Sequence, residues 1–240
     1  LLNHPDFKTI NFSKLKMTLA GGMAMQHQVA HDWEAVTGCK VCEGYGMTES
    51  SPVITMNPPN AIQIGTIGVP APNTHIRIVN DDGQDVTLGE SGELWAKGPQ
   101  VMKGYWQRAE ATAETVTSDG WLKTGDVAII QADGYIKIVD RKKDMILVSG
   151  FNVYPNEIED VAASHAGVLE SAAVGIPDKK SGEAVKLFVV KKDPSLTEES
   201  LLLHLKAGLT GYKLPRTIVF KDELPKSPVG KILRRELRDK

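Results

Sequence analysis

A run of five charged residues divides the chain near its middle. Asp140-Arg141-Lys142-Lys143-Asp144 follows a segment, 135–139, that alternates like a half-buried strand, and it precedes a short apolar strand at 145–148. We expect so charged a segment to stay outside any hydrophobic core. One interpretation is a joint between two folded parts. The other is a solvated turn between two hairpins of one domain, and the local sequence leaves both open.

The residues after the joint predict a compact α+β part. Ser149-Gly150 breaks the short strand, and Pro155 with Glu157 and Glu159 suits a first helical turn, because proline fixes φ and acids favour the positive end of the helix dipole. The further elements expected are a helix at 154–164, strands near 171–176 and 184–191, a helix at 197–209 with Ser195 and Glu198 in capping-box spacing, a strand at 216–221, and a rigid exposed loop at 224–231 with a lysine at its tip and a short helix behind.

The residues before the joint begin as strand, glycine turn and helix. We expect a short buried strand at 17–20, the turn Gly21-Gly22, a helix at 23–37, a strand at 39–43, and then a loop from Gly44 to Pro52. Ligands of α/β sheets bind outside the carboxyl ends of strands. In this loop the ring of Tyr45, hydroxyl groups and the Glu49 carboxylate offer a stacking face, hydrogen-bond donors and a hard oxygen ligand. A glycine-rich turn with polar decoration fits the loop equally well.

From residue 62 to about 139 the pattern changes to short β segments separated by turns. Strands are expected at 75–79, 92–97 and 126–131, with one helix at 107–116, and a small barrel or curled sheet is the natural arrangement. Asp126 follows Thr124-Gly125, so it could present its carboxylate to a vicinal diol at the start of a strand. A lone Thr-Gly-Asp is otherwise an ordinary turn.

The predicted fold class is therefore α/β and α+β. We expect the end of a large α/β sheet subdomain (1–60) and a small β-barrel-like subdomain (61–142), which together form the C-terminal part of a large domain. A mobile C-terminal α+β domain follows at 143–240. Because the sequence opens without Met and in what resembles the end of a helix, we also expect a fragment of something longer.

Composition and the isolated motifs argue against several classes of partner and site. A formal charge of −2, with 28 basic and 30 acidic residues, gives no general attraction to nucleic acid. No apolar run reaches the roughly 20 residues that span a bilayer, so a cytoplasmic location is expected. Cys39 and Cys42 form a lone C-x-x-C without a second pair, and His27 and His31 lack a third ligand, so neither pair predicts a metal site.

Five motifs in a fixed order make the chain resemble the adenylate-forming enzymes, which include acyl-CoA synthetases, peptide-synthetase adenylation domains and luciferases. The motifs are Tyr45-Gly46-Met47-Thr48-Glu49, Gly92-Glu93-Leu94 through Gly104-Tyr105, Thr124-Gly125-Asp126, Asp140-Arg141 through Gly150, and Pro225-Lys226 through Gly230-Lys231. The resemblance covers nearly the whole chain. Among its branches, Glu43 to Ser50, 140–146 and 151–155 are most similar to bacterial long-chain fatty acyl-CoA synthetases.

The resemblance implies a role for each matching residue in activating a carboxylic acid with ATP and Mg²⁺. Tyr45 in its Tyr45-Gly46 motif would stack on adenine, Gly21 and Gly22 would pass close to the ring and the acyl carboxylate, Thr48 would bind the α-phosphate, Glu49 would hold Mg²⁺, and Asp126 assisted by Arg141 would bind the ribose hydroxyls. Lys231 would be the ammonium that stabilises the transition state of adenylate formation.

The second half-reaction implied by the resemblance transfers the acyl group to coenzyme A. The C-terminal domain would turn about Lys143, withdraw Lys231 and bring in Gly150, which leaves room for pantetheine. The implied substrates are a fatty acid, ATP and CoA, and the resemblance is compatible with peripheral contact with the inner membrane and with a homodimer. The alternatives are a carrier protein as acceptor, or a binding fragment without chemistry of its own.

One part of the family's pattern does not occur in the sequence. The Ser/Thr/Gly-rich phosphate loop belongs upstream of Gly21, and no such loop precedes that residue here. We therefore expect these 240 residues alone to bind ATP poorly and not to adenylate a fatty acid.

Overall fold

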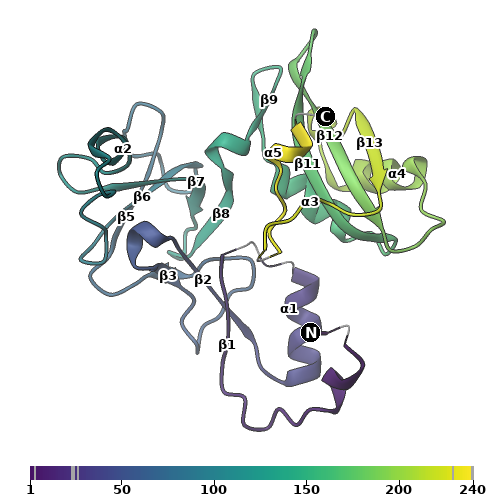
Figure 1. Cartoon of the computed structure of the whole chain (residues 1–240), viewed down its shortest axis with the longest axis horizontal. Helices are drawn as coiled ribbons and strands as arrows, with labels where there is room; N and C mark the ends of the chain where they lie inside the picture. Colours follow the sequence, from purple (N-terminus) through teal and green to yellow (C-terminus); the bar gives the residue numbers. More distant parts are fainter. Residues whose placement is uncertain (3, 23–24, 26, 229, 239–240) are drawn as a thin grey trace. The chain divides into compact units, whose positions relative to one another are not determined.

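The chain folds into two compact units, Leu1–Ile138 and Val139–Lys240. The computed structural model describes residues 1–240 with the exception of 3, 23, 24, 26, 229, 239 and 240. Figure 1 traces the described elements along the chain. The division falls within one strand, immediately before the charged joint, and each unit is described by itself below.

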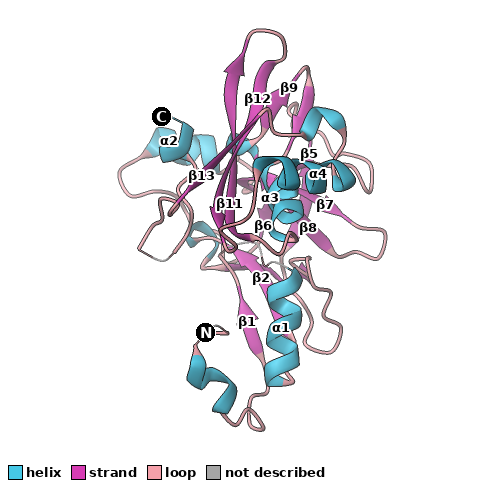
Figure 2. Ribbon diagram, turned by 90° about the vertical axis from the view of Figure 1, so that its right-hand side faces the viewer, coloured by secondary structure: helices cyan, strands magenta, loops and turns pink. Residues whose placement is uncertain are grey.

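The first unit contains two sheets and two α-helices, among the residues described (Figure 2). Its elements are η1 (Pro5–Thr9), β1 (Thr18–Ala20), α1 (His27–Thr37), β2 (Val41–Gly46), η2 (Thr48–Ser50), β3 (Val53–Met56), β4 (Val69–Pro70), β5 (His75–Val79), β6 (Gly92–Lys97), α2 (Ala109–Thr115) and β7 (Leu122–Ile130), followed by β8 (Ile136–Arg141), which runs on into the second unit.

The two sheets of the first unit have the orders β1-β2-β3-β4 and β5-β6-β7-β8. β1 and β2 are parallel, whereas β2, β3 and β4 are antiparallel neighbours. An isolated antiparallel bridge between Gly68 and Ile136 links the ends of the two sheets, and Ile54, Leu94, Leu122 and Ile136 pack in one shared core. The predicted combination of an α/β segment and a small β-rich subdomain is confirmed.

The second unit is an α+β sandwich. Its elements are η3 (Lys142–Asp144), β9 (Ile146–Val148), β10 (Phe151–Val153), α3 (Pro155–Ala163), β11 (Val168–Asp178), β12 (Gly182–Lys191), α4 (Glu198–Gly208), η4 (Gly211–Lys213), β13 (Thr217–Lys221) and α5 (Arg235–Arg238). β11 and β12 form a long antiparallel pair, and β13 lies parallel to β12.

Both faces of this second sheet are covered. One core contains Ala173 and Leu187 together with Ile158 of α3 and Leu205 of α4. Residues one position along the strands, such as Ala172 and Phe188, pack on the opposite face with Leu224 and Leu237 of the C-terminal segment. The alternation follows from the two-residue period of a strand, and it places α3 and the C-terminal segment on opposite faces.

Most predicted elements exist, but several differ in detail. The expected helix at 23–37 is seen from His27, because Met23, Ala24 and Gln26 lie outside the described residues. The strand expected to be buried at 17–20 is not, since Leu19 is 59% exposed; within the described chain β1 pairs only with β2. Helix α4 is capped by Thr197, whose hydroxyl accepts from Ser200 N at 3.2 Å, rather than by Ser195.

The prediction that the charged joint stays outside a core is wrong for its two aspartates. Asp140 is 1% exposed and Asp144 is 8% exposed, whereas Lys142 and Lys143 point to solvent. The aspartates are buried because later parts of the same unit supply donors to them, as described below. No helix among the residues described is long and apolar enough to cross a bilayer.

Candidate functional site

The end of β2 forms a turn that only glycine permits at one position. A Cβ on Gly46 would lie 1.8 Å from the carbonyl oxygen of Pro52, so the chain must pass here without a side chain. The turn is closed by a hydrogen bond from Met47 N to Pro52 O at 3.0 Å. The Ser50 hydroxyl donates to Met47 O at 3.0 Å inside the same turn. The structure therefore corrects one boundary, since 44–46 belong to β2 rather than to a loop.

Thr124-Gly125-Asp126 forms a β-bulge inside β7 rather than a turn at a strand start. The pairing of β6 with β7 shifts in register at this point, and Gly125 has φ +73°. The Thr124 hydroxyl donates to Leu94 O at 2.7 Å, and Gly125 N donates to a carboxylate oxygen of Glu93 at 3.1 Å. A bulge changes the direction in which the following side chain points. Here it directs Asp126 toward the end of β2.

Two predicted site residues far apart in sequence meet at this bulge. The Tyr45 hydroxyl donates to Oδ2 of Asp126 at 2.5 Å, and both side chains are half-buried. A hydrogen bond from a neutral phenol orients the carboxylate without cancelling its charge. The ring and the carboxylate thus form one fixed surface of the first unit.

A second tyrosine holds the other predicted carboxylate. The Tyr105 hydroxyl donates to Oε1 of Glu49 at 2.7 Å, and this bond is the largest cause of a raised pKa of Tyr105. The phenol of Tyr105 therefore stays protonated and remains a hydrogen-bond donor. Tyr105 was not among the predicted site residues. The motif ending in Gly104-Tyr105 was a signal for it, but its spacing did not indicate which carboxylate it reaches.

Of the two glycines after β1, Gly21 lies beside β2. A Cβ on Gly21 would be 3.1 Å from Gly44 O, and Gly22 has φ +83°. Nearby, the buried carboxylate of Glu43 accepts from Gly65 N at 2.7 Å, and desolvation raises its pKa. Glu43 therefore holds the end of β2 to the loop that follows β3. Sequence reasoning missed this role because it depends on a contact across 22 residues.

Thr48, in contrast, is exposed at the start of η2, where its side chain faces solvent. It lies next to Glu49 in the same short turn. A hydroxyl and a carboxylate at adjacent positions are therefore both accessible on this side of the first unit.

The remaining predicted residues, Arg141, Lys143, Gly150 and Lys231, belong to the second unit. Ser149 and Gly150 have φ +51° and +83° and join β9 to β10 as a two-residue hairpin turn. No atom lies within 4 Å of a Cβ built on Gly150, so the space beside it is open. Lys143 is exposed, and its carbonyl oxygen accepts from Arg238 at 3.3 Å.

Lys231 lies in a small hairpin of the C-terminal segment. Ser227 N donates to Lys231 O at 2.8 Å, and Lys231 N donates to the Ser227 hydroxyl at 3.1 Å. An antiparallel bridge joins Lys226 to Ile232. The lysine was predicted at the tip, but it begins the returning side of the hairpin and is half-buried.

Close to this hairpin the second unit contains a buried ionic cluster. Its members are Asp140, Asp144, Glu159, Arg234 and Arg238. Desolvation raises the pKa of Asp140 to about 6, although the backbone N–H groups of Asn156 and Arg141 and the Arg234 charge act in the opposite direction. Apart from Arg141, the groups that contact Asp140 lie at least 16 residues away in sequence, so the local pattern did not reveal them.

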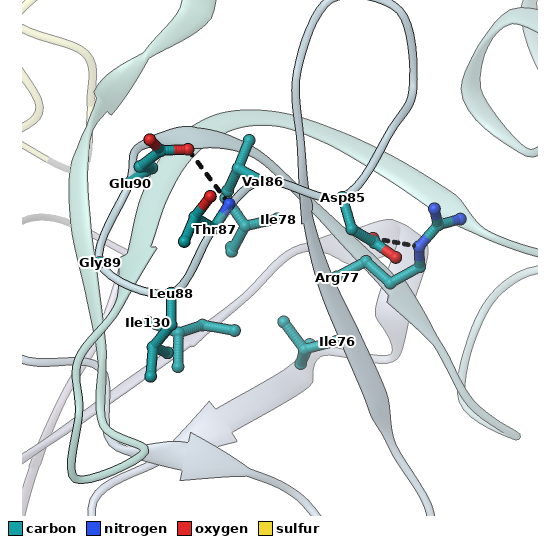
Figure 3. A pocket seen from close by; sticks show the side chains of 10 residues that line it. All are labelled: Ile76, Arg77, Ile78, Asp85, Val86, Thr87, Leu88, Gly89, Glu90 and Ile130. Atoms are coloured by element: carbon teal, nitrogen blue, oxygen red, sulfur yellow. Dashed lines mark hydrogen bonds and ion pairs between the residues drawn. The ribbon is translucent and has the colours of Figure 1, made fainter.

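The first unit also has a surface hollow of about 240 Å³ beneath residues 85–90 (Figure 3). Apolar side chains, among them Ile76, Leu88 and Ile130, line it. Its charged groups are engaged locally: Arg77 pairs with Asp85 at 2.6 Å, and Glu90 accepts from Thr87 N at 3.1 Å. None of the predicted site residues lines this hollow.

Comparisons with known proteins agree across both units. Residues 1–106 match the family model "AMP-binding enzyme", and residues 157–231 match "AMP-binding enzyme C-terminal domain". The chain is 60% identical to a long-chain-fatty-acid–CoA ligase of Yersinia pestis and 59% identical to one of Haemophilus influenzae. In both cases 100% of this chain is covered, and the chain spans only 42% of the relative's length.

A solved structure supports the same assignment. The ATP-bound MatB of Rhodopseudomonas palustris has a TM-score of 0.94 and 34% sequence identity, covering 100% of this chain and 48% of that one. Two family models therefore match in chain order, and both a relative and a structure cover the whole sequence. The chain belongs to the adenylate-forming, AMP-binding enzymes, whose motifs it carries in both units.

Proposed function

We propose that this chain supplies part of the nucleotide site and the mobile catalytic domain of a ligase that activates a long-chain fatty acid with ATP and transfers it to coenzyme A. The observation that carries the proposal is the hydrogen bond between Tyr45 and Asp126, because it joins two adenylate-forming motifs that are 81 residues apart. The identities of 60% and 59% to long-chain-fatty-acid–CoA ligases support the acid and the acceptor.

The first unit binds the nucleoside. The Tyr45 ring gives adenine a stacking surface. Gly21 lies close to β2 and has no side chain, so the adenine ring can approach its backbone. The Asp126 carboxylate accepts hydrogen bonds from the ribose hydroxyls, and Arg141 assists from the start of the joint. Because Tyr45 already fixes the carboxylate, little side-chain entropy is lost when the nucleotide binds.

Thr48 and Glu49 act on the phosphates. The Thr48 hydroxyl donates to the α-phosphate, and Glu49 is the protein ligand of a Mg²⁺ ion. A site with one carboxylate fits this metal, because Mg²⁺ is commonly bound by one or two carboxylates together with substrate phosphates and water. When bound, the ion neutralises charge on the phosphate oxygens. Tyr105 orients Glu49 by donating to one of its oxygens.

In the first half-reaction a carboxylate oxygen of the fatty acid attacks the α-phosphorus of ATP. The new bond is a C–O–P acyl phosphate link, the bond from the α-phosphorus to the bridging oxygen breaks, and pyrophosphate leaves with the electron pair. Negative charge crowds around the phosphorus as this happens. The Lys231 ammonium, a compact point charge, stabilises that charge.

In the second half-reaction the thiol of coenzyme A, as thiolate, attacks the acyl carbon, and AMP leaves. An ammonium next to that carbonyl would obstruct the incoming sulfur. We infer that the second unit turns about Lys143, whose side chain is exposed, so that Lys231 withdraws and the open space beside Gly150 admits pantetheine.

The test separates the two half-reactions in the complete protein. ATP–pyrophosphate exchange with a long-chain fatty acid reports the first, and transfer from supplied acyl-adenylate to CoA reports the second. Lys231→Ala should reduce exchange by about 100-fold or more and leave transfer within about threefold. Lys226→Ala, in the same hairpin, is the matched control and should retain most of both activities.

Either of two results would overturn the assignment of Lys231. One is an equal loss of both half-reactions in Lys231→Ala, and the other is unchanged exchange. Assays with CoA and with a carrier protein in parallel distinguish the acceptors. Faster transfer to the carrier protein would replace CoA in the proposal.

A further inference from the structure

The ionic cluster of the second unit joins three segments that are distant in sequence. Arg234 donates from Nε and Nη2 to the two oxygens of Glu159 at 3.0 and 2.6 Å, and from Nη2 to the side-chain oxygen of Asn156 at 2.7 Å. Its Nη1 lies 3.6 Å from Asp144 and 3.9 Å from Asp140. One guanidinium group therefore contacts helix α3 and both ends of the charged joint.

The position of the cluster in the fold explains why an arginine is needed. α3 and the C-terminal segment cover opposite faces of the sheet, and Glu159 also accepts from Ala173 N of β11 at 2.8 Å. The guanidinium presents several donors in a rigid plane, so it can bind a carboxylate in a bidentate manner and reach other acceptors as well. A single ammonium cannot do both.

Burial makes this arrangement rigid. The side chains of Arg234 and Glu159 are 18% and 17% exposed, and that of Asp140 is 1% exposed. Removing one partner of a buried ion pair leaves a charge without compensation, so such pairs rarely open in the folded state. Arg234 is consequently a fixed point of the second unit.

Arg234 stands three residues after Lys231, at the base of the hairpin that carries it. Leu233 N donates to Pro225 O at 2.8 Å, which closes that base. On the opposite side of the hairpin, Lys226 pairs with Glu170, but both of these side chains are 30% or more exposed. The buried support of the hairpin is therefore on the Arg234 side.

The C-terminal segment that carries Arg234 also binds the charged joint through a second arginine. Arg238 donates to Asp144 Oδ1 at 2.9 Å and to Lys143 O at 3.3 Å. Asp144 thus lies between two arginines of the C-terminal segment. Asp140 precedes Lys143 in the chain and Asp144 follows it. A rotation about Lys143 would therefore move Asp144 together with the arginines and the Lys231 hairpin, and it would separate Arg234 from Asp140.

We propose that Arg234 is a positioning residue for adenylate formation, which fixes the Lys231 hairpin to α3 and to the joint so that the Lys231 ammonium reaches the α-phosphate at a set place. The proposal rests on the proposed role of Lys231. Arg234 itself does not touch the substrates. It acts through the geometry of the hairpin.

The test compares Arg234→Gln and Arg234→Lys with Arg235→Gln in the complete protein. Arg235 is the next residue, is exposed, and undergoes the same chemical change. Arg234→Gln should lower kcat of ATP–pyrophosphate exchange at least tenfold while KM for ATP and the rate of transfer from supplied acyl-adenylate each change less than threefold. Arg234→Lys should recover part of the loss, and Arg235→Gln should behave like the unaltered protein.

A merely structural role predicts a different outcome. Destabilisation alone would lower both half-reactions together, in proportion to the loss of folded protein measured by circular dichroism. If Arg234→Gln does not fold, Glu159→Gln, which keeps the side-chain shape and removes the charge, decides instead and should lower exchange selectively by about threefold to tenfold. Parallel losses of both steps in the folded variants, or no loss of exchange, would overturn the proposal.

The Lys231→Ala variant keeps this test separate from the proposed function. If Lys231→Ala abolishes exchange and the Arg234 and Glu159 variants do not affect it selectively, the positioning role fails while the function stands. If Lys231→Ala itself leaves exchange intact, the assignment of Lys231 fails first.

Discussion

Two motif carboxylates of the first unit accept hydrogen bonds from phenol groups, whereas the carboxylates of the ionic cluster in the second unit contact arginines. Tyr45 and Tyr105 each donate a phenol hydroxyl to Asp126 and Glu49, which are half-buried. In the second unit Arg234 and Arg238 contact Asp140, Asp144 and Glu159, which are mostly buried.

The difference separates two uses of the same chemical group. A tyrosine orients a carboxylate and leaves its charge available to a metal ion or to hydroxyl groups. An arginine neutralises the carboxylate it binds and makes it a structural connection. In the proposed function, the first unit accordingly binds a ligand and the second transmits a movement.

The strongest way to break this comparison is to remove the charge of Glu49. Glu49→Gln keeps an acceptor for Tyr105 but cannot hold Mg²⁺ well, so ATP–pyrophosphate exchange in the complete protein should fall by about 10³-fold. Tyr105→Phe is the matched control and should cost only about fivefold, the value of one hydrogen bond. Similar losses in the two variants would show that orientation, and not charge, matters here.

Next in size is the pH dependence that Asp140 gives the second unit. A carboxyl pKa raised from 3.8 to about 6 means that the folded protein binds this proton more tightly than the unfolded chain. The contribution of Asp140 to the free energy of unfolding is fully present below pH 3.8. It is lost as the pH rises through about 6, by up to about 3 kcal/mol. The free energy of unfolding of Asp140→Asn, relative to the unaltered protein, should rise by that amount over the same range.

Hydrogen exchange of the β12 amides measures this pH-dependent change in the stability of the second unit. Tryptophan fluorescence would not report it, because all four tryptophans precede residue 122 and therefore lie in the first unit. Asp178→Asn is the control of opposite sign. The pKa of Asp178 is lowered by the N–H of Lys180 and by Arg216, so its variant should lose relative stability as the pH rises. A difference between Asp140→Asn and the unaltered protein that stays constant with pH would contradict the buried, ionisable state of Asp140.

A smaller effect distinguishes two glycines with the same backbone conformation. Gly150 and Gly134 have φ +83° and +86°, and neither has an atom within 4 Å of a built Cβ. Valine at either position should destabilise its unit by about 1–2 kcal/mol. Only Gly150→Val should also slow acyl transfer to CoA, by about tenfold, with less effect on adenylate formation. Equal rates of transfer in the two variants would remove Gly150 from the thiol step.

The smallest expected change is at Tyr45. Tyr45→Phe keeps the stacking ring and loses the bond to Asp126, so KM for ATP should rise about fivefold. Asp126→Asn in the same background completes a double-mutant cycle with a coupling of about 1 kcal/mol. Additive effects would mean that Tyr45 contributes only through its ring.

The sequence predicted those parts of the fold that local pattern determines. Strands at 75–79 and 92–97 were found at these bounds because β-branched or alternating apolar residues are typical of a strand. The proline at the start of α3 marked that helix correctly. The motif order also indicated the family and pointed to Tyr45 and Asp126, although not to the hydrogen bond between them.

The sequence could not reveal features that depend on distant partners. The burial of Asp140 and Asp144 requires Arg234 and Arg238, about 90 residues later, and a charged run by itself indicates solvent. The bulge at Gly125 requires β6 as a partner, so the sequence alone indicated only a strand start or an ordinary turn at Thr-Gly-Asp. The pairing of Tyr105 with Glu49 spans 56 residues.

Because of the bulge at Gly125, the direction of the Asp126 side chain depends on the number of residues in β7. Successive residues of a strand point to opposite faces. In β7, however, the three residues 124–126 stand opposite the single residue Leu94 of β6, which is two residues more than a regular antiparallel pairing. Deleting Gly125 would remove no charge and no functional group, yet it would leave one extra residue instead of two and change the direction in which Asp126 points. Length, and not only chemistry, therefore specifies this site, and a single-residue deletion here should be as harmful as loss of the aspartate itself.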